Sequence, residues 1–359
     1  LPMYSADKIP KKRLLSMQLD LSKFEPATGE EKLQHEQMRA STTFFRDGMR
    51  KLFKNPLAVL SLCILLALIA VIVLAPLVVP YGYSEMITVN GKRDKGARNM
   101  GPFQYSKLEQ DAINEGQKIF PHIFGTDELS RDYFVRVVYG ARVSLMIGLF
   151  ASLIVLLIGL VYGSISGYVG GRVDMVMMRF VDIIYSLPDT LMVILLSVVL
   201  DQVLGLALKG TALARVGSNM LSLFIVFALL YWVGMARLVR GQILSIKNNE
   251  YVLAARALGA KPGRIIKKHI LPNCMGVIFI STALQIPSAI FTESFLSFIG
   301  LGVQTPMPSL GSLANAARGA LQTYPSKLVF PAVGICLIVL SLNLLGDGLR
   351  DAFDPKLRR

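Results

Sequence analysis

Long uncharged, apolar stretches alternate with charged segments along this chain. Residues 57–79 and 143–171 form uncharged runs of 23 and 29 residues. Because an α-helix rises about 1.5 Å per residue, about 20 apolar residues are enough to cross about 30 Å of hydrocarbon. Four further runs have a similar character, at 183–200, 216–236, 270–292 and 328–346. The pattern predicts an all-α membrane protein with six transmembrane helices.

The segments around these runs define the remaining predicted parts. Phe45, Met49, Leu52 and Phe53 recur at the spacing of one helical face, which predicts an interfacial helix before the first span. We divide the chain into a cytoplasmic N-terminal tail (1–44), the interfacial helix with the first transmembrane helix (45–79), an external loop (80–139), a transmembrane domain (140–351) and a cytoplasmic C-terminal tail (352–359).

Glycines recur every fourth residue in the second span. Gly159, Gly163 and Gly167 form two consecutive steps of a small-residue pattern that lets another helix approach closely in a membrane. A membrane helix that merely tolerates glycine is the alternative. We expect these three residues to serve helix packing.

The apolar segment 293–313 is interrupted by glycines and prolines, so it cannot form one continuous helix. Non-helical backbone near membrane depth has to pack in protein or line a cavity. We therefore expect an external gate here, and a simple interfacial loop is the alternative. The gate candidates are Glu293, Phe295, Phe298, Gly300 and Gly302.

Composition supports the membrane class. Hydrophobic residues make up 53% of the 359 residues and the mean hydropathy is +0.52, whereas soluble domains contain about 45–50% apolar residues. The formal net charge is +14. With the N-terminus in the cytoplasm, 25 of the 38 Lys and Arg residues fall on the cytoplasmic side, as the positive-inside rule requires. We expect both termini in the cytoplasm and no nucleic-acid partner.

Side chains for covalent chemistry or metal binding do not cluster in the sequence. The three histidines lie in separate segments and the three cysteines lie in apolar runs, so no metal site, His-based triad or disulfide is expected. No complete phosphate-binding loop is present. Asp182, Asp189 and Glu293 lie at span ends, where contacts with the interface or a helix terminus account for them. We expect no catalytic residue, metal or bound cofactor.

The segment 237–268 is the most basic connection between spans, with eight Lys and Arg against the single acid Glu250. Within it, an apolar face is followed by Gly259, which predicts a short amphipathic helix, and a second short helix begins near Pro262. The small alanines on an exposed face favour close docking of a partner with an acidic rim. A helix lying on anionic lipid is the alternative. The face consists of Tyr251, Ala254, Ala255 and Leu258.

This segment resembles the cytoplasmic "EAA" loop of ABC importer permeases, Glu-Ala-Ala-x3-Gly-x9-Ile-x-Leu-Pro. Leu253 stands at the Glu position and His269 at the Ile position. The resemblance implies a coupling helix that docks in a groove of an ATP-binding subunit. The residues implied in coupling are Tyr251, Ala254, Ala255, Leu258, Gly259, His269, Leu271 and Pro272.

Other segments are similar to the C-type permease subunit of oligopeptide and dipeptide ABC importers. They are FKNPLAVLSL (53–62), FGTDELSRDYFVRVVYGARVSL (124–145), GYVGGRVDMVMMRFVD (167–182), ESFLSFIGLG (293–302) and GDGLRDAFDP (346–355). The resemblance implies a type I importer fold in the bacterial inner membrane and a multi-pass transport subunit that is not an enzyme.

The same resemblance implies partners. These are a homologous second permease subunit, two ABC ATPase subunits that hold ATP and Mg²⁺, and an external peptide-binding protein. Membrane lipid surrounds the assembly. Nickel or glutathione importers within the same family are alternatives, although only His122 lies in the external half. A channel or secondary carrier that needs no ATPase is a less favoured class.

Overall fold

The computed structural model describes residues 44–211, 217–303 and 307–353. The chain divides into two units, Leu1–Arg46 and Asp47–Arg359, and the account below concerns the second. Residues 1–43 of the predicted N-terminal tail (1–44) and residues 354–359 of the predicted C-terminal tail (352–359) lie outside the described residues.

Six helices in the described residues are long and apolar enough to cross a membrane, in agreement with the predicted number. Their bounds are α3 (Pro56–Val78), α5 (Tyr133–Val169), α7 (Asp189–Ala207), the continuous helix Ser218–Ile246, the continuous helix Pro262–Phe298 and α14 (Ser326–Phe353). Two of them contain a π-helical turn. Ser218–Ile246 comprises α8 (Ser218–Val226), η4 (Phe227–Tyr231) and α9 (Trp232–Ile246), whereas Pro262–Phe298 comprises α11 (Pro262–Ile265), η5 (Ile266–Ile270) and α12 (Leu271–Phe298).

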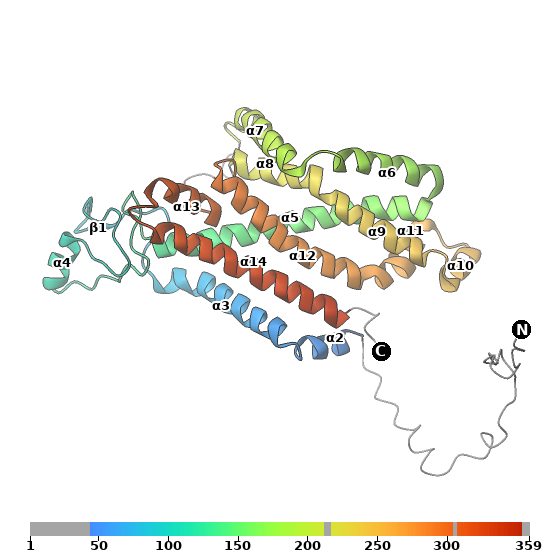
Figure 1. Ribbon diagram of the computed structural model, residues 1–359, viewed down its shortest axis with the longest axis horizontal. Coiled ribbons are helices and arrows are strands. Elements are labelled where there is room, and N and C mark those ends of the chain that lie inside the picture. Colours follow the sequence, from blue (N-terminus) through green and yellow to red (C-terminus); the bar gives the residue numbers. More distant parts are fainter. Residues whose placement is uncertain (1–43, 212–216, 304–306, 354–359) are drawn as a thin grey trace, which may run out of the picture. The chain divides into compact units, whose positions relative to one another are not determined.

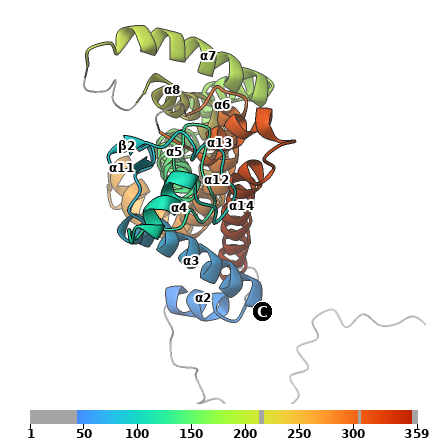
Figure 2. The same ribbon diagram turned by 90° about the vertical axis from the view of Figure 1, so that its left-hand side faces the viewer.

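Helix α5 lies at the centre of this bundle. It packs along α9 and α12, while α14 packs between α12 and α3 (Figure 1). Helix α7 contacts α8 and crosses above the other helices (Figure 2). The apolar core is therefore divided among several helix–helix seams, and the outward faces of α3 and α7 remain exposed and apolar.

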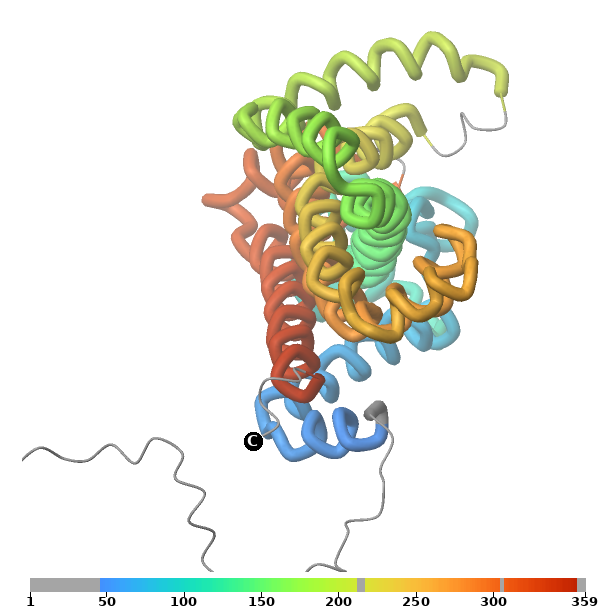
Figure 3. The backbone as a smooth tube through the Cα atoms, turned by 90° about the vertical axis from the view of Figure 1, so that its right-hand side faces the viewer, coloured from blue at the N-terminus to red at the C-terminus, as the bar shows by residue number. Residues whose placement is uncertain are grey.

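Shorter elements cover the two ends of the bundle. One end carries β1 (Thr88–Val89), β2 (Lys92–Arg93), α4 (Lys107–Asn114) and α13 (Leu310–Ala317), which is followed by the 3₁₀ turn η6 (Arg318–Ala320). The other end carries α10 (Glu250–Ala257) and α11, as Figure 3 shows from that side. Helix α2 (Phe44–Leu52) ends near the C-terminal end of α14. Its last residue, Leu52, packs with Ala58 of α3 and Ala352 of α14.

Helix α5 begins ten residues before the predicted start of the second span at 143. The Asp132 carboxylate caps it by accepting a hydrogen bond from the Val135 N–H at 2.9 Å. Arg136 fits within the first turns because its guanidinium donates to the Tyr83 carbonyl at 3.0 Å and faces Asp127. Charged residues with local partners therefore extend the helix beyond the apolar run.

The predicted third span, 183–200, is wrong at its start. Helix α6 (Gly171–Tyr185) ends before Pro188, and α7 begins at Asp189. Proline disfavours helical backbone at the preceding residue, and Pro188 itself is extended at φ −62° and ψ 114°. The apolar run therefore belongs to two helices.

The predicted second short helix after Pro262 is not separate. It continues through η5 into α12, and Pro272 lies in the first turn of α12, where a missing N–H is tolerated. The predicted interruption between 293 and 313 is present, because α12 ends at Phe298 and α13 begins at Leu310.

Candidate functional site

Helix α10 and the turn after it join α9 to α11. Val252 and Ile265 are fully buried in one core cluster, and Ala255 is also buried. The prediction that both alanines lie on an exposed face is therefore wrong for Ala255, whereas Ala254 is exposed. Ala255 allows α10 to lie close to the bundle because it has only a methyl group to bury.

The rest of α10 is exposed and includes several apolar side chains. Leu258 is 88% exposed, Leu253 45% and Tyr251 41%. Single exposed apolar residues are common, but three within residues 251–258 favour a protein contact at this connection. Leu253, at the position where the EAA pattern has Glu, is one of these exposed apolar side chains.

Gly259 ends the helix in the left-handed region at φ +78°. A side chain there would meet open space, so the backbone conformation rather than crowding requires glycine. The Gly259 N–H donates to the Arg256 carbonyl at 3.0 Å and the Ala260 N–H to the Ala255 carbonyl at 3.1 Å. The turn directs the chain back toward α11 and leaves Leu258 at the tip.

Hydrogen bonds connect α10 to the first turn of α12. The Asn273 amide donates to the Tyr251 hydroxyl at 3.1 Å and to the His269 carbonyl at 2.7 Å. Ile270, between His269 and Leu271, is fully buried. The coupling residues predicted from the sequence thus lie in one connected unit, which extends from the exposed tip into a spanning helix.

The three glycines of α5 lie against α9. A Cβ at Gly159 would lie 2.6 Å from the Met235 Cβ, and one at Gly163 would lie 2.5 Å from the Ala236 carbonyl oxygen. At Gly167 the Arg240 carbonyl oxygen would be 3.0 Å away. No side chain fits at the first two positions without displacement, so α9 approaches the α5 backbone directly.

Ion pairs hold α6 on the same surface of α9. Arg240 donates from Nε and Nη2 to the two carboxylate oxygens of Asp174, both at 2.6 Å, and this bidentate pair keeps the pKa of Asp174 below its ordinary value. Arg237 pairs with Asp182 at 2.7 Å and lies over the Tyr185 ring. Helices α5, α6 and α9 therefore form one block beside α10.

Glu293 is fully buried in α12, so the prediction of an interfacial contact at a span end is wrong. Its carboxylate accepts hydrogen bonds from the hydroxyls of Ser144 at 2.8 Å, Ser297 at 2.7 Å and Ser294 at 3.3 Å. Ser144 comes from α5, and its oxygen also accepts from the Leu310 N–H at 3.4 Å. We call these four side chains the Glu293 cluster; it joins α5, α12 and α13.

The remaining gate candidates surround the end of α12. Phe295 and Phe298 are 39% and 36% exposed, and the Arg318 guanidinium lies 5.2 Å from the Phe298 ring centre. Gly300 has φ +90°. A Cβ at Gly302 would lie 2.1 Å from the Ser297 oxygen, so the chain after α12 folds tightly back onto the Glu293 cluster.

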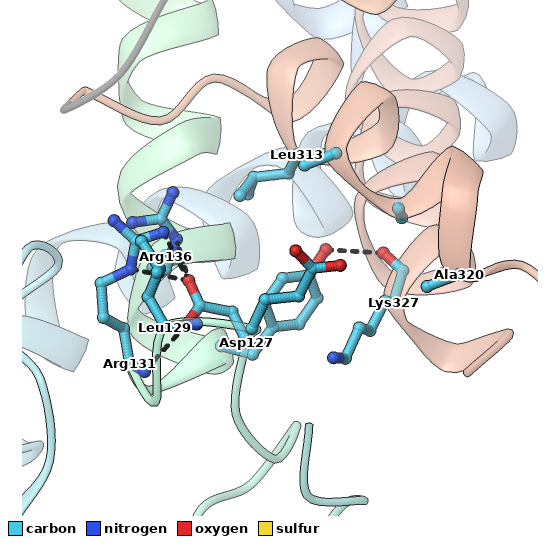
Figure 4. A pocket seen from close by; sticks show the side chains of 11 residues that line it. Asp127, Leu129, Arg131, Arg136, Leu313, Ala320 and Lys327 are labelled. Atoms are coloured by element: carbon cyan, nitrogen blue, oxygen red, sulfur yellow. Dashed lines mark hydrogen bonds and ion pairs between the residues drawn. The ribbon is translucent and has the colours of Figure 1, made fainter. Parts of the chain in front are cut away.

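A pocket of about 220 Å³ opens beside α13 at this end of the bundle (Figure 4). Asp127 accepts from the Arg131 Nε at 2.7 Å and lies 3.4 Å from the Arg136 Nε. The Tyr133 hydroxyl donates to the Lys327 carbonyl at 2.6 Å, which joins α5 to the start of α14. The apolar part of the wall comes mainly from α13 and η6, through Leu313, Ala316, Ala317 and Ala320.

His122 occupies a buried acidic cluster that the sequence did not reveal. Its Nδ1 lies 2.8 Å from Asp132 and its Nε2 2.9 Å from Glu109, with all three side chains at most 1% exposed. Burial lowers the pKa of His122, but the two carboxylates outweigh this and raise it to about 9. In the sequence, the pattern Ser106-x-x-Glu109 could have predicted the start of α4, where these residues form a capping box. It could not have predicted the contact of Glu109 with His122.

Sequence comparison identifies the protein family. Residues 159–359 match the family described as "Binding-protein-dependent transport system inner membrane component". The chain belongs to this family. Residues 43–102 also match the N-terminal TM domain of oligopeptide transport permease C. A binding-protein-dependent permease is a multi-pass membrane protein that performs transport, not an enzyme.

Characterised relatives of this permease extend over most of its length. The chain is 40% identical to the oligopeptide transport system permease protein OppC of Bacillus subtilis (strain 168), over 94% of this chain and 97% of the relative. It is 43% identical to the dipeptide transport system permease protein DppC of the same organism, over 89% and 88%. Among solved structures, the inward-facing MetNI methionine ABC transporter matches with a TM-score of 0.44 and 17% identity, over 60% of this chain and 96% of that chain.

Proposed function

We propose that this chain is one permease subunit of an ATP-driven importer that carries oligopeptides or dipeptides. The peptide substrate is inferred from relatives that are named oligopeptide and dipeptide permeases. In this proposal a homologous permease forms the other half of the pathway and an external binding protein delivers the peptide. Nickel and glutathione remain alternative cargoes within the same family.

The observation that carries the energy-coupling part of the proposal is the exposed apolar tip of α10. A large apolar side chain that is 88% exposed, as Leu258 is, suits a groove in another protein. We propose that each permease subunit presents this tip to one ABC ATPase, and that ATP and Mg²⁺ bind only in the ATPase subunits. Both termini and α10 then lie on the cytoplasmic side.

The hydrogen bonds from Asn273 link α10 to α12 and so connect the proposed docking site to a spanning helix. Closure of the ATPases on ATP displaces α10, and the continuous helix Pro262–Phe298 transmits this displacement along its length. At its far end lies the Glu293 cluster, next to the break before α13. We propose that this break, with Phe295 and Phe298, forms the external gate.

The direct test is purification of the chain with the subunits that bind it, followed by an ATPase assay with peptide and the external binding protein. The proposal predicts a complex with two ATPase subunits and hydrolysis that peptide-loaded binding protein stimulates. Recovery of this chain alone, without an ATPase, would contradict it. Stimulation by nickel or glutathione but not by peptides would favour the alternative cargo.

A further inference from the structure

The connection between α6 and α7 is a break in helical backbone at residues 186–188. The carbonyl oxygens of Tyr185 and Ser186 have no hydrogen-bond partner among the described residues, and neither have the N–H groups of Asp189 and Thr190. Helix α7 also has no side-chain cap at this end. These polar backbone groups therefore need partners from outside the described part of the chain.

Packing places this break in the middle of the membrane. Ile184, close to the end of α6, packs in the same core cluster as Ile158 of α5, and Ile158 lies near the centre of the uncharged run 143–171. Asp189 also acts electrostatically on Tyr231 of η4, the middle part of another spanning helix. In Figure 1, α6 accordingly lies along the half of the bundle that carries α10. The break is therefore inside the hydrocarbon region, not at its boundary.

The side chains around the break face away from the rest of this chain. Tyr185 is 61% exposed and Leu187 41%, and Ser186, Asp189 and Thr190 are exposed as well. Hydrocarbon offers no hydrogen-bond partner, so non-helical backbone at this depth persists only where it packs in protein or lines a water-filled cavity. This surface therefore meets either another subunit or water.

Asp189 is the first residue of α7, where the positive end of the helix dipole favours its ionised form. It has no ion pair or hydrogen bond among the described residues. Arg237 of α9 is already engaged, because it pairs with Asp182 at 2.7 Å and lies 4.3 Å from the Tyr185 ring centre. A charged residue inside the membrane faces water or a partner of opposite sign, so Asp189 can hold a cation supplied from outside.

Water satisfies this surface better than a single protein side chain does. A basic residue of another subunit could neutralise Asp189, but Lys and Arg carry only donors, so the N–H groups of Asp189 and Thr190 would still lack acceptors. Asp182 is 51% exposed despite its ion pair, so the polar surface extends beyond the break. A polar surface in the middle of the membrane is what a water-filled pathway requires.

We propose that residues 185–190 line the water-filled pathway and that the Asp189 carboxylate binds the terminal ammonium group of a peptide in transit. This inference rests on the proposed peptide transport and adds a contact for the cargo in the middle of the membrane. The ammonium group is the positive charge that every peptide with a free N-terminus carries near pH 7, whatever its sequence. Asp189 thus contacts a feature shared by all such cargoes and does not select among their side chains.

Cysteine accessibility tests the water-filled face on the full-length chain, purified with its co-expressed subunits and held in lipid nanodiscs. Ser186→Cys is made in a background in which Cys63, Cys274 and Cys336 are replaced by Ala. Two water-soluble methanethiosulfonates, one cationic and one anionic, report how fast the thiolate at position 186 reacts. Leu66→Cys is the matched control, because Leu66 is 56% exposed on the continuous spanning helix α3.

We expect both reagents to modify the thiol introduced at position 186, whereas the thiol at position 66, which lipid shields, should stay largely unmodified. Asp189→Asn should lower the ratio of cationic to anionic rates about fourfold, because one nearby charge in water speeds one reagent and slows the other about twofold each. Asp189→Glu should keep the wild-type ratio. Lack of modification at position 186, or an unchanged ratio in Asp189→Asn, would overturn the proposal. So would loss of a second permease subunit from Asp189→Asn, since Asp189 would then pair with a protein cation.

Protection by peptide tests the ammonium contact. Modification by the cationic reagent is repeated with excess trialanine or N-acetyltrialanine, without the external binding protein, so that the selectivity of that protein does not enter. Trialanine should slow the reaction more than its acetylated form does, and Asp189→Asn should remove this difference. Equal protection by the two peptides when Asp189 is present would overturn the ammonium contact.

Peptide uptake by the same complexes separates this inference from the proposed function. A complex that imports peptide but leaves position 186 unmodified would overturn this inference and leave the proposed function intact. A complex in which position 186 reacts with the expected charge dependence, but which imports no peptide, would contradict the proposed function and with it the ammonium contact, while the water-filled face would stand.

Discussion

Leu258 shows how one side chain defines the proposed docking surface. It lies at the tip of α10 and is 88% exposed, whereas Ala255, three residues earlier, is buried. The two residues therefore have different surroundings, because Leu258 faces outward, where we propose that the ATPase docks, and Ala255 is buried. The alanine pair in the sequence drew attention to this helix, but the outward apolar residues carry its contact surface.

Replacement of Leu258 by Asp should release the ATPase. A charge at the centre of a buried apolar contact typically costs about 2 kcal/mol or more in binding, so we expect at least about a tenfold loss of co-purified ATPase. Lys95→Asp, which changes an exposed charge at the opposite end of the bundle, is the control. Quantitative pull-down at matched expression measures the effect, and equal retention in both variants would exclude α10 as the docking element.

His122 is a residue whose protonation state is fixed by its surroundings. Both ring nitrogens face carboxylate oxygens, and a carboxylate can only accept, so both nitrogens carry a proton. The resulting imidazolium joins Glu109 of α4 to Asp132, the cap of α5. The cluster therefore ties the loop region to the start of a spanning helix.

The raised pKa of His122 predicts a specific pH dependence. The folded-state pKa of about 9 exceeds the ordinary 6.5, so the stabilisation is fully present below pH 6.5 and is lost as the pH rises through about 9. His122→Gln should cost about 1–3 kcal/mol by leaving buried acceptors unsatisfied, and it should abolish this contribution. Thermal melting of both forms between pH 6.5 and 9.5 measures it; parallel curves would show that His122 does not titrate in this way.

At the scale of elements, the apolar runs were enough to predict the six spanning helices. Hydrocarbon sets their length, so long uncharged runs of sequence report them directly. Their ends were less predictable. Charged residues with partners extend α5 to Tyr133, and Pro188 divides α6 from α7 within an apolar run. The apolar pattern of the sequence predicts neither the extension of α5 nor the break between α6 and α7.

Part of the candidate site could likewise be predicted from the sequence, and part of it could not. The α10 connection could be recognised because its residues follow one another in sequence. The Glu293 cluster and the His122 cluster could not, since Ser144 and Glu293 are 149 positions apart and Glu109 and His122 meet through the loop fold. Contacts that depend on tertiary packing leave no local pattern to read.

Loss of the Glu293 cluster should loosen α13. Glu293→Ala removes the carboxylate that accepts from the hydroxyls of Ser144, Ser294 and Ser297, so these buried hydrogen bonds are lost. Hydrogen exchange of residues 310–317 should become faster by about an order of magnitude, as expected for a loss of about 1–2 kcal/mol. Ser197→Ala, which removes a buried hydroxyl without a partner in the structure, should leave this exchange unchanged. Slow exchange in both variants would show that the cluster does not hold α13.

Direct contact between α5 and α9 gives a second prediction for elements. Gly163→Ala places a methyl group 2.5 Å from the Ala236 carbonyl oxygen, so the helices must separate at a cost of about 1–3 kcal/mol. Gly241→Ala on α9 meets nothing within 4 Å and should not destabilise the protein. Melting of the two purified variants compares them, and equal midpoints would contradict close α5–α9 packing.

At the scale of the whole molecule, the proposed movement passes from one end of the helical bundle to the other. It begins at the exposed tip of α10, enters α12 through Asn273 and ends at the Glu293 cluster beside α13. The long helix Pro262–Phe298 is the physical link between these points. Transport in this account needs no reactive side chain, because the chain changes shape in response to work done by its partners.

Peptide uptake into proteoliposomes tests this account most directly. Complexes that contain wild type or Leu258→Asp are reconstituted with the external binding protein and labelled peptide outside, and with ATP and Mg²⁺ either inside or omitted. The account predicts uptake by wild type only with ATP inside, and little uptake by Leu258→Asp under either condition. Uptake that continues without ATP, or that Leu258→Asp leaves intact, would contradict it.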